Sequence, residues 1–261
     1  MKTADWLRRY GITLKKSLGQ VFLSDQRIAK KIASFVPSGS KVVEIGAGAG
    51  TLTEELAKCV RKVISVEVDR RLEPLLRERL EPFENVTLVF EDFLKLDLTE
   101  YGNYVFVGNL PYHLGTRIIG KLLKETSTEL AILMLQKEVA ERITACPGSK
   151  DYCSLSVFVQ SLCDVKVLFH VAPSHFVPNP KVESTVISLH PATRSRDPEF
   201  EGFVRRCFSN RRKKLINSAK ISSKLLESLG IPADVRPENL SVEDYRKLFE
   251  VVKAWRKTST R

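Results

Sequence analysis

The feature that most constrains the fold is a regular alternation of short apolar segments with amphipathic ones between residues 41 and 144. Strands are predicted for the short apolar segments 41–45, 62–66, 86–90, 104–107 and 130–135. Helices are predicted for the amphipathic segments 51–59, 69–80, 116–125 and 137–144. Repeated strand–helix–strand units are typical of a doubly wound sheet with parallel strands. We therefore expect a Rossmann-like α/β domain in this part of the chain.

Two later strands break this alternation. Segments 165–170 and 182–189 follow a predicted helix at 154–163, and the loop between the two strands is too short to hold a crossover helix. Neighbouring strands joined by such a loop run antiparallel. We therefore expect the sheet to be mostly parallel, with its last strand antiparallel.

The sequence predicts two domains. Residues 190–200 are polar and contain two prolines, and after them only helical patterns occur. We expect a first domain over residues 1–193, in which residues 1–36 form a basic N-terminal segment. A small, all-helical domain is expected over residues 194–261.

Positive charge is concentrated at the two ends of the chain. There are 42 basic and 31 acidic residues, which gives a net charge of +11. Residues 1–36 have a net charge of +6 and residues 194–261 of +8, while residues 37–193 have −3. A polyanion that contacts both ends explains this distribution, and nucleic acid is the polyanion that it favours. Charge alone does not separate RNA from DNA or from an anionic membrane surface.

The remaining composition points to the cytoplasm. The five cysteines contain no C-x-x-C pair, and the four histidines show no spacing typical of metal ligands. No apolar run approaches the length of a membrane span, and the N-terminus lacks the apolar core of a secretion signal. We expect a cytoplasmic monomer with reduced thiols, without a metal site or membrane contact.

A glycine-rich turn follows the first predicted strand, with glycine at positions 46, 48 and 50. Such a turn lets the backbone approach a ligand closely. Glu67 ends the next strand, where a carboxylate can accept both hydroxyls of a ribose. A dinucleotide-binding turn needs glycine at position 51, where this chain has Thr51. The spacing therefore favours S-adenosylmethionine, which has no pyrophosphate, over a nicotinamide dinucleotide.

Asp92 and Phe93 directly follow the third predicted strand. Ligands of open α/β sheets bind outside the carboxyl ends of the strands, so both residues are expected at the cofactor site. The Asp92 carboxylate is predicted to accept a hydrogen bond from the exocyclic amine of the cofactor adenine. Phe93 is predicted to pack on the adenine ring.

The sequence Asn109-Leu110-Pro111-Tyr112 follows the fourth predicted strand. The lone pair of an amine on a base is delocalised into the ring, and two acceptors on its hydrogens would draw the nitrogen toward tetrahedral geometry. The Asn109 side-chain oxygen and the Leu110 backbone carbonyl are the predicted acceptors. Pro111 would stiffen the loop, and Tyr112 would stack on the base. The motif thus predicts methylation of a base amine.

Together these motifs resemble those of the adenine-N6 dimethyltransferases of ribosomal RNA. The resemblance rests on K-K-S-L-G-Q-V-F-L (15–23), E-I-G-A-G-A-G (44–50), Glu67, E-D-F (91–93), N-L-P-Y (109–112), F-V-P-N-P-K-V-E-S (176–184) and C-F-S-N-R-R-K-K-L-I-N (207–217). It spans nearly the whole chain and implies a Rossmann-like catalytic domain with a helical C-terminal domain. It further implies dimethylation of two adjacent adenosines in the 3′-terminal hairpin of 16S rRNA in the small ribosomal subunit, as a late step of subunit biogenesis.

The resemblance also assigns roles to individual residues. The cofactor contacts that it implies, together with those predicted above, are Val21, Leu23, Gly46, Gly48, Glu67, Asp92, Phe93 and Asn109. At position 21 the family usually has a polar residue, so Val21 can offer the cofactor only a backbone contact. Phe176, in a proline-rich loop that should offer little core, would stack on the target adenine opposite Tyr112. The predicted contacts to RNA phosphates are Arg211, Arg212, Lys213 and Lys214.

Three alternatives are weighed against this interpretation. An Erm-type methyltransferase of 23S rRNA has the same fold, but the basic segment 207–217 resembles the KsgA type more closely. A non-catalytic assembly or transcription factor on this fold would not need the intact Asn109–Tyr112 motif and Glu67. A nicotinamide-dependent dehydrogenase is disfavoured by Thr51 and by the lack of an evident proton donor.

Overall fold

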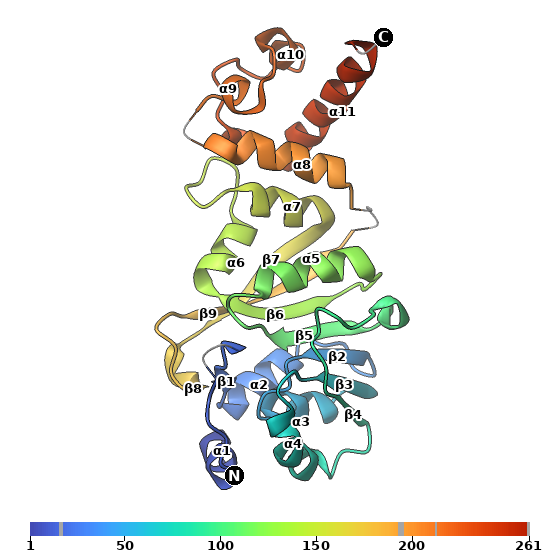
Figure 1. Ribbon diagram of the computed structural model, residues 1–261, viewed down its shortest axis with the longest axis vertical. Coiled ribbons are helices and arrows are strands. Elements are labelled where there is room, and N and C mark those ends of the chain that lie inside the picture. The colour runs from blue at the N-terminus through green and yellow to red at the C-terminus, as the bar shows by residue number, and fades with distance from the viewer. Residues whose placement is uncertain (16–17, 193–195, 212, 260–261) are drawn as a thin grey trace. The chain divides into compact units, whose positions relative to one another are not determined.

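The computed structural model describes residues 1–15, 18–192, 196–211 and 213–259 (Figure 1). The chain forms two compact units. The first comprises Met1–Ala140 and Lys166–Ala192, and the second comprises Glu141–Val165 and Thr193–Arg261. The sequence predicted a single division between residues 193 and 194, whereas residues 141–165 belong to the second unit in the structure.

In the described residues, the first unit is built around a seven-stranded sheet with the order β4-β3-β2-β5-β6-β9-β7. Its strands are β2 (Lys41–Ile45), β3 (Lys62–Val66), β4 (Val86–Val89), β5 (Val105–Asn109), β6 (Ala131–Gln136), β7 (Cys163–Val171) and β9 (Ser184–Pro191). The pairs β3–β4, β2–β3, β2–β5 and β5–β6 are parallel, and β9 runs antiparallel to β6. The mostly parallel, Rossmann-like sheet with an antiparallel last strand is therefore confirmed.

The segments that connect these strands form helices, because apolar residues recur in them at helical spacing. In the first unit they are α1 (Thr3–Arg9), α2 (Gln26–Ala33), α3 (Thr51–Ala57), α4 (Glu73–Leu80), α5 (Gly115–Glu125) and the first half of α6 (Lys137–Thr144), whose residues from Glu141 on belong to the second unit. Asp25 caps α2 by accepting a hydrogen bond from the backbone N–H of Arg27. Short 3-10 turns occur at Arg70–Leu72, Thr99–Tyr101 and Pro173–His175.

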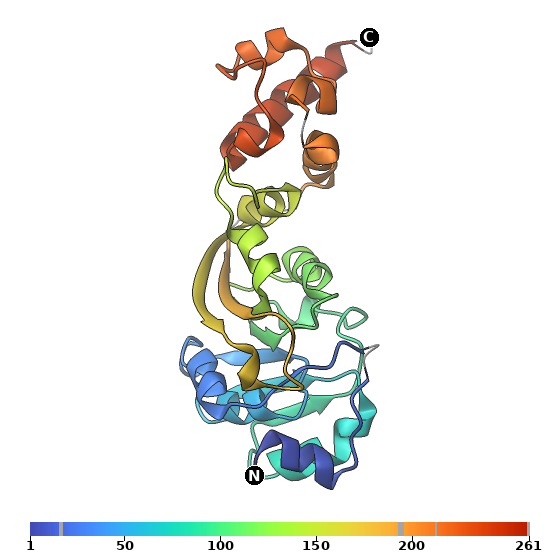
Figure 2. The same cartoon turned by 90° about the vertical axis from the view of Figure 1, so that its left-hand side faces the viewer.

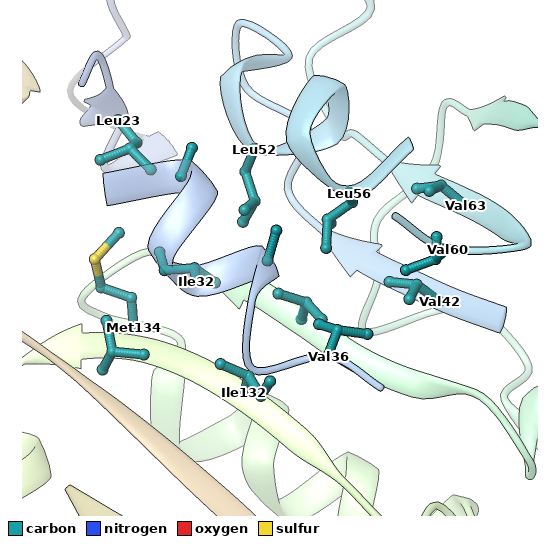
Figure 3. Close-up of a cluster of buried hydrophobic side chains, with 14 of the residues drawn as sticks. Leu23, Ile32, Val36, Val42, Leu52, Leu56, Val60, Val63, Ile132 and Met134 are labelled. Carbon is teal, nitrogen blue, oxygen red and sulfur yellow. The ribbon is translucent and has the colours of Figure 1, made fainter. Parts of the chain in front are cut away.

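The core of the first unit lies between these helices and the sheet. Figure 3 shows Ile32 of α2 and Val36 after it pointing toward the strands, beside Leu52 and Leu56 of α3. On the sheet side the labelled residues of this core are Val42, Val63, Ile132 and Met134. This packing fixes α3, and with it the glycine-rich turn that precedes α3, against the carboxyl end of β2.

The N-terminal segment lies along the first unit. Helix α1 lies beside α4 (Figure 2), where Leu7 packs with Leu72, Leu75 and Leu76. The strands β1 (Phe22–Leu23) and β8 (Phe176–Val177) form a second, two-stranded sheet. They run antiparallel, with Leu23 opposite Phe176. Both α1 and β1 are thereby packed on other parts of the first unit.

In the part of the chain that the structure describes, the second unit contains helices and the beginning of β7. Its helices are α7 (Ser154–Leu162), α8 (Pro198–Cys207), α9 (Leu215–Ala219), α10 (Ser223–Glu227) and α11 (Val242–Ser259), with 3-10 turns at Phe208–Asn210 and Pro237–Asn239. Tyr152 and Val157 are buried in the same apolar core as Phe203 and Leu248. This shared core explains why residues 141–165 join the C-terminal helices. No helix among the described residues is long and apolar enough to cross a membrane.

Candidate functional site

A cavity lies at the carboxyl ends of the parallel strands of the first unit. Residues at or just after the carboxyl ends of β2, β3, β4 and β5 line it, and they include Gly46, Glu67, Asp92 and Asn109. The chain runs from β2 outward to β3 and β4, then returns to β5 on the other side of β2. Open α/β sheets bind ligands at such a reversal of strand order, because the loops on either side diverge there.

Most of the residues predicted from the sequence meet at this cavity. Those that line it are Val21, Leu23, Gly46, Gly48, Glu67, Asp92, Phe93, Asn109, Leu110, Pro111 and Tyr112. The charged residues among the described lining residues are all acidic: Glu67, Glu91 and Asp92. These three acidic side chains favour a cofactor that carries a sulfonium and an ammonium group.

Two glycines shape the turn above β2. Gly46 has φ +81° and Gly48 has φ +55°, a region that side chains other than glycine rarely adopt. A Cβ atom at position 48 would lie 2.9 Å from the ring of Phe22. The two glycines thus let the turn fold tightly beneath the N-terminal segment and keep its backbone open toward the cavity.

Glu67 is held in place by the backbone around it. Its Oε2 accepts a hydrogen bond from the N–H of Gly48 at 2.8 Å, and its Oε1 accepts one from the N–H of Asp69 at 2.8 Å. Burial raises the pKa of this carboxyl, and the backbone donors oppose that shift. A carboxylate offers about four lone-pair sites, so each oxygen retains one for a ligand hydroxyl. The geometry fits the predicted contact to a ribose.

We expect Glu67→Ala to weaken binding of S-adenosylmethionine at least tenfold, since a hydrogen bond to a charged group contributes about 1.5–3 kcal/mol. Isothermal titration calorimetry measures this affinity. Glu67→Gln serves as a second variant, because it preserves the size of the side chain but removes the charge and one acceptor. Wild-type affinity in both variants would remove Glu67 from the ribose site, provided that their thermal unfolding shows a folded protein.

Asp92 and Phe93 form one wall of the cavity. Asp92 Oδ1 accepts a hydrogen bond from the N–H of Leu94 at 2.9 Å, which orients the carboxylate within its own turn. Phe93 is buried and meets Phe106 edge-on, with 6.3 Å between the ring centroids. An oriented acceptor beside a fixed aromatic ring is an arrangement that can hold an adenine.

The side-chain amide of Asn109 has a fixed orientation. Its Nδ2 donates a hydrogen bond to the backbone carbonyl of Val21 at 2.9 Å. Because the nitrogen is committed to this carbonyl, the amide oxygen on the other branch is left as an acceptor for a ligand. The N–H of Leu110 donates to the carbonyl of Met134 at 3.0 Å and thereby ties the loop to β6. Both predicted acceptors therefore belong to a segment that the sheet holds in place.

The sequence did not reveal how position 21 contributes. We expected a backbone contact from Val21 to the cofactor, and the structure shows its carbonyl bonded to Asn109. Gln20, which the prediction left out, holds this segment: its Nε2 donates to Asp69 Oδ2 at 2.7 Å. Its Oε1 accepts from the N–H of Lys15 at 2.8 Å. The only available signal was the position of Gln20 within the N-terminal motif.

Tyr112 places an aromatic ring beside the cavity, three residues after Asn109. Its hydroxyl lies 3.2 Å from Ser184 Oγ, and burial raises the pKa of the phenol while the bond to Ser184 opposes this shift. The ring is only partly buried and lines the cavity. The tyrosine is therefore anchored at one end and can offer its ring to a base.

Comparison with known proteins decides the family. A family model described as "Ribosomal RNA adenine dimethylase" matches residues 11–254. The chain belongs to the ribosomal RNA adenine dimethylase family. It is 48% identical to the "Ribosomal RNA small subunit methyltransferase A" of Thermotoga petrophila over 98% of this chain and 97% of that protein. It is 38% identical to the protein of the same name from Bacillus pumilus, over 97% of this chain and 96% of that one.

Solved structures agree with the fold of this dimethylase. A dimethyladenosine transferase from Plasmodium falciparum has a TM-score of 0.79 and 29% identity, covering 89% of this chain and 98% of that one. The 23S rRNA methyltransferase ErmE has a TM-score of 0.72 and 27% identity, covering 89% of this chain and 99% of that one. The predicted family, the methyltransferase fold and the class of enzyme are therefore confirmed, and the dehydrogenase alternative is excluded.

Phe176 does not lie where the dimethylase motif predicted it. Its loop was expected to offer little core, and this expectation is wrong: the side chain is 1% exposed and belongs to an apolar core of the first unit. Its strand pairs with β1, which places it opposite Leu23 and covers the ring. Phe176 is not among the residues that line the cavity. Of the two aromatic residues predicted to stack on the base, Tyr112 lines the cavity and Phe176 does not.

The basic residues of the dimethylase that were predicted to contact RNA phosphates differ in their surroundings. The guanidinium of Arg211 donates hydrogen bonds to the backbone carbonyls of Ser149 and Lys150 within the second unit, and it faces Glu238. The side chain thus ties two segments of the protein together, which disfavours the predicted contact to RNA phosphates. Lys213 and Lys214 are exposed. Arg212 lies outside the described residues.

A buried carboxyl beneath the glycine-rich turn was not predicted to have any role. Glu44 is completely buried, and its Oε2 accepts hydrogen bonds from Thr53 Oγ1 at 2.6 Å and Ser65 Oγ at 2.5 Å. Its Oε1 has no hydrogen-bond partner among the described residues. Burial raises the pKa of Glu44 to about 7, although the two hydroxyl groups oppose the shift. The group links β2, β3 and α3 directly below the cofactor cavity.

We expect Glu44 to make folding stability depend on pH. An acid whose pKa is raised in the folded state binds its proton there between pH 4.5 and about 7, while the unfolded chain has already lost it. The contribution is therefore complete below pH 4.5 and is lost as the pH rises toward 7. The shift corresponds to about 3 kcal/mol.

Urea unfolding at pH 5 and pH 8 measures this contribution. Between these pH values the free energy of unfolding of wild type should fall by about this much more than that of Glu44→Gln. Glu81→Gln, an exposed control, should follow wild type. Parallel pH profiles of wild type and Glu44→Gln would contradict the assignment.

Proposed function

We propose that this enzyme dimethylates the N6 amines of two adjacent adenosines in the 3′-terminal hairpin of 16S rRNA, using S-adenosylmethionine, as a late step of small-subunit biogenesis. The observation that carries the proposal is the fixed amide of Asn109, whose oxygen is left as an acceptor in a cavity lined by acidic and apolar groups. The names of the curated relatives support the small subunit as its source of substrate. We place the reaction in the cytoplasm and expect a monomer.

The residues of the site divide between cofactor and base. Glu67 and Asp92 would hold the ribose and the adenine of the cofactor, beside Phe93. When bound, S-adenosylmethionine supplies a methyl group activated by its sulfonium sulfur. Asn109 Oδ1 and the Leu110 carbonyl would accept the two hydrogens of the target amine and make its lone pair available. Tyr112 would stack on the base, which returns about 1–3 kcal/mol of the cost of removing it from the RNA stack.

The proposal is tested with labelled S-adenosylmethionine and purified ribosomal subunits that lack the modification. We expect label in small-subunit RNA at two adjacent adenosines, as dimethyladenosine. Label in the large subunit would favour an Erm-type activity, and binding to small subunits without label would favour an assembly factor. Asn103→Ala, an exposed asparagine in the loop before β5, is a control for changes at Asn109.

We expect Lys213 and Lys214 to bind phosphates of the RNA. Neither makes an ion pair with a described residue within 4.0 Å, and both precede α9. Lys213→Gln with Lys214→Gln should weaken binding to small subunits and lower the slope of log affinity against log salt by about 1 for each phosphate that is no longer bound. Filter binding at several salt concentrations measures both. Arg211→Ala is expected to destabilise the second unit instead, and an unchanged salt slope in the double variant would exclude the two lysines.

A further inference from the structure

A second cluster of charge lies at the opposite end of the sheet from the cofactor cavity. Lys41 and Lys62 are the first residues of β2 and β3, and Arg61 precedes Lys62. Together with Glu84, Asn85 and Tyr104 they line an open depression at the amino ends of the strands. The cofactor cavity lies at the carboxyl ends of the same strands, so a ligand in this depression would not touch the catalytic residues.

The register of the sheet brings the positive charges together. Lys41 is the direct partner of Lys62 in the parallel pair β2–β3, and both side chains are exposed. Like charges on directly opposed residues destabilise a sheet. Lys41, Arg61 and Lys62 form no ion pair within 4.0 Å with any described carboxylate, and Glu84 is the one acidic residue among those that line the depression. The arrangement therefore lowers stability unless an external anion neutralises it.

The cluster is not explained by a general excess of basic residues. Residues 37–193 carry 17 basic and 20 acidic residues, so this part of the chain has a net negative charge. The Lys41 ammonium also lies 5.7 Å from the centre of the Tyr104 ring. The strand starts are fixed, because the N–H of Arg61 donates to the carbonyl of Ser40 and that of Val63 to Asn85, each at 2.9 Å. Three cations are thus presented from a rigid edge.

We propose that this edge, defined by Lys41, Arg61 and Lys62, is a second RNA contact that binds backbone phosphates away from the modified adenosines. Strands in a sheet are about 4.8 Å apart, so the two lysines can contact neighbouring phosphate oxygens of one strand. The depression is open, which suits a polyanion that passes across it. The inference rests on the proposed function, because it assumes that the substrate is ribosomal RNA.

The test is a variant with Lys41→Gln, Arg61→Gln and Lys62→Gln. Binding to small subunits and to a plain RNA duplex is measured over a range of salt concentrations. Each phosphate that the variant no longer binds lowers the slope of log affinity against log salt by about 0.7–0.9, so the slope should fall by about 2 for both ligands. Glu84→Gln should have the opposite effect: because it removes a negative charge from the depression, this variant should bind both RNA ligands more tightly. Affinity for S-adenosylmethionine should not change, because the variant leaves the cofactor cavity intact.

The control removes the same charge elsewhere on the first unit. The control variant carries Lys30→Gln, Lys124→Gln and Lys166→Gln, which lie in three different elements, α2, α5 and β7. If this control lowers the salt slope as much as the edge variant, or if the edge variant keeps the wild-type slope, the inference is wrong. A loss of affinity confined to intact subunits, with normal binding to the RNA duplex, would indicate a protein partner and overturn it as well. If the triple variant does not fold, Lys41→Gln and Lys62→Gln are tested singly, each with an expected change of about 0.7–0.9.

Methylation by the wild-type enzyme separates this inference from the proposed function. If wild type does not methylate small subunits, the proposed function fails. If wild type methylates them and the edge variant shows the same affinity and salt slope, only the second contact fails.

Discussion

Asn109→Ala should reduce the turnover number for methyl transfer at least about 100-fold, the usual scale for removing one preorganised hydrogen-bond group from an active site. The alanine variant lacks the oxygen that would accept a hydrogen of the target amine. It also lacks the Nδ2 donor to the carbonyl of Val21, which holds the N-terminal segment over the cavity. Single-turnover methylation of small subunits measures the chemical step directly.

Cofactor affinity separates the two consequences of this substitution. If the main effect is on the target amine, affinity for S-adenosylmethionine should fall only a few-fold while turnover collapses. A parallel loss of both would mean that Asn109 acts mainly by ordering residues 18–23. Asn103→Ala should behave as wild type in both assays. Near-normal turnover in Asn109→Ala would remove this residue from the mechanism.

The sequence predicted that four residues of the cavity lie together because each comes at or after the end of a predicted strand. Gly46, Glu67, Asp92 and Asn109 follow four strands that the apolar pattern identifies, and parallel strands bring their carboxyl ends to one edge of the sheet. The chemistry of each position then follows from its residue type. Local pattern and a general rule of topology suffice for this part of the site.

The contacts that fix the site were not predictable in the same way. The bond from Asn109 to Val21 joins residues 88 positions apart, and that from Gln20 to Asp69 joins residues 49 apart. No periodicity reports such pairs, because they depend on where the N-terminal segment crosses the turn above β2. The two units of the structure differ from the predicted division for a related reason: Tyr152 packs with residues after position 200, and the pattern before it gives no sign of this.

The clearest difference between sequence and structure concerns Phe176. Phe176→Ala should lower the free energy of unfolding by about 3–5 kcal/mol, since it removes a buried ring and leaves a cavity between β8 and the core around Leu23. Urea unfolding followed by circular dichroism measures the change. Phe35→Ala is the matched control: this ring is 38% exposed, so its loss should be much less destabilising.

Phe176→Leu distinguishes packing from base stacking. Leucine retains most of the apolar volume, so the protein should stay folded, but it cannot stack on an adenine. If Phe176 only supports the core, the leucine variant should methylate small subunits at close to the wild-type rate. A folded leucine variant that binds subunits normally and has lost turnover would show that β8 leaves β1 during the reaction and brings the ring to the base. If Phe176→Ala lost turnover but kept the wild-type free energy of unfolding, that result would contradict the buried position of this side chain.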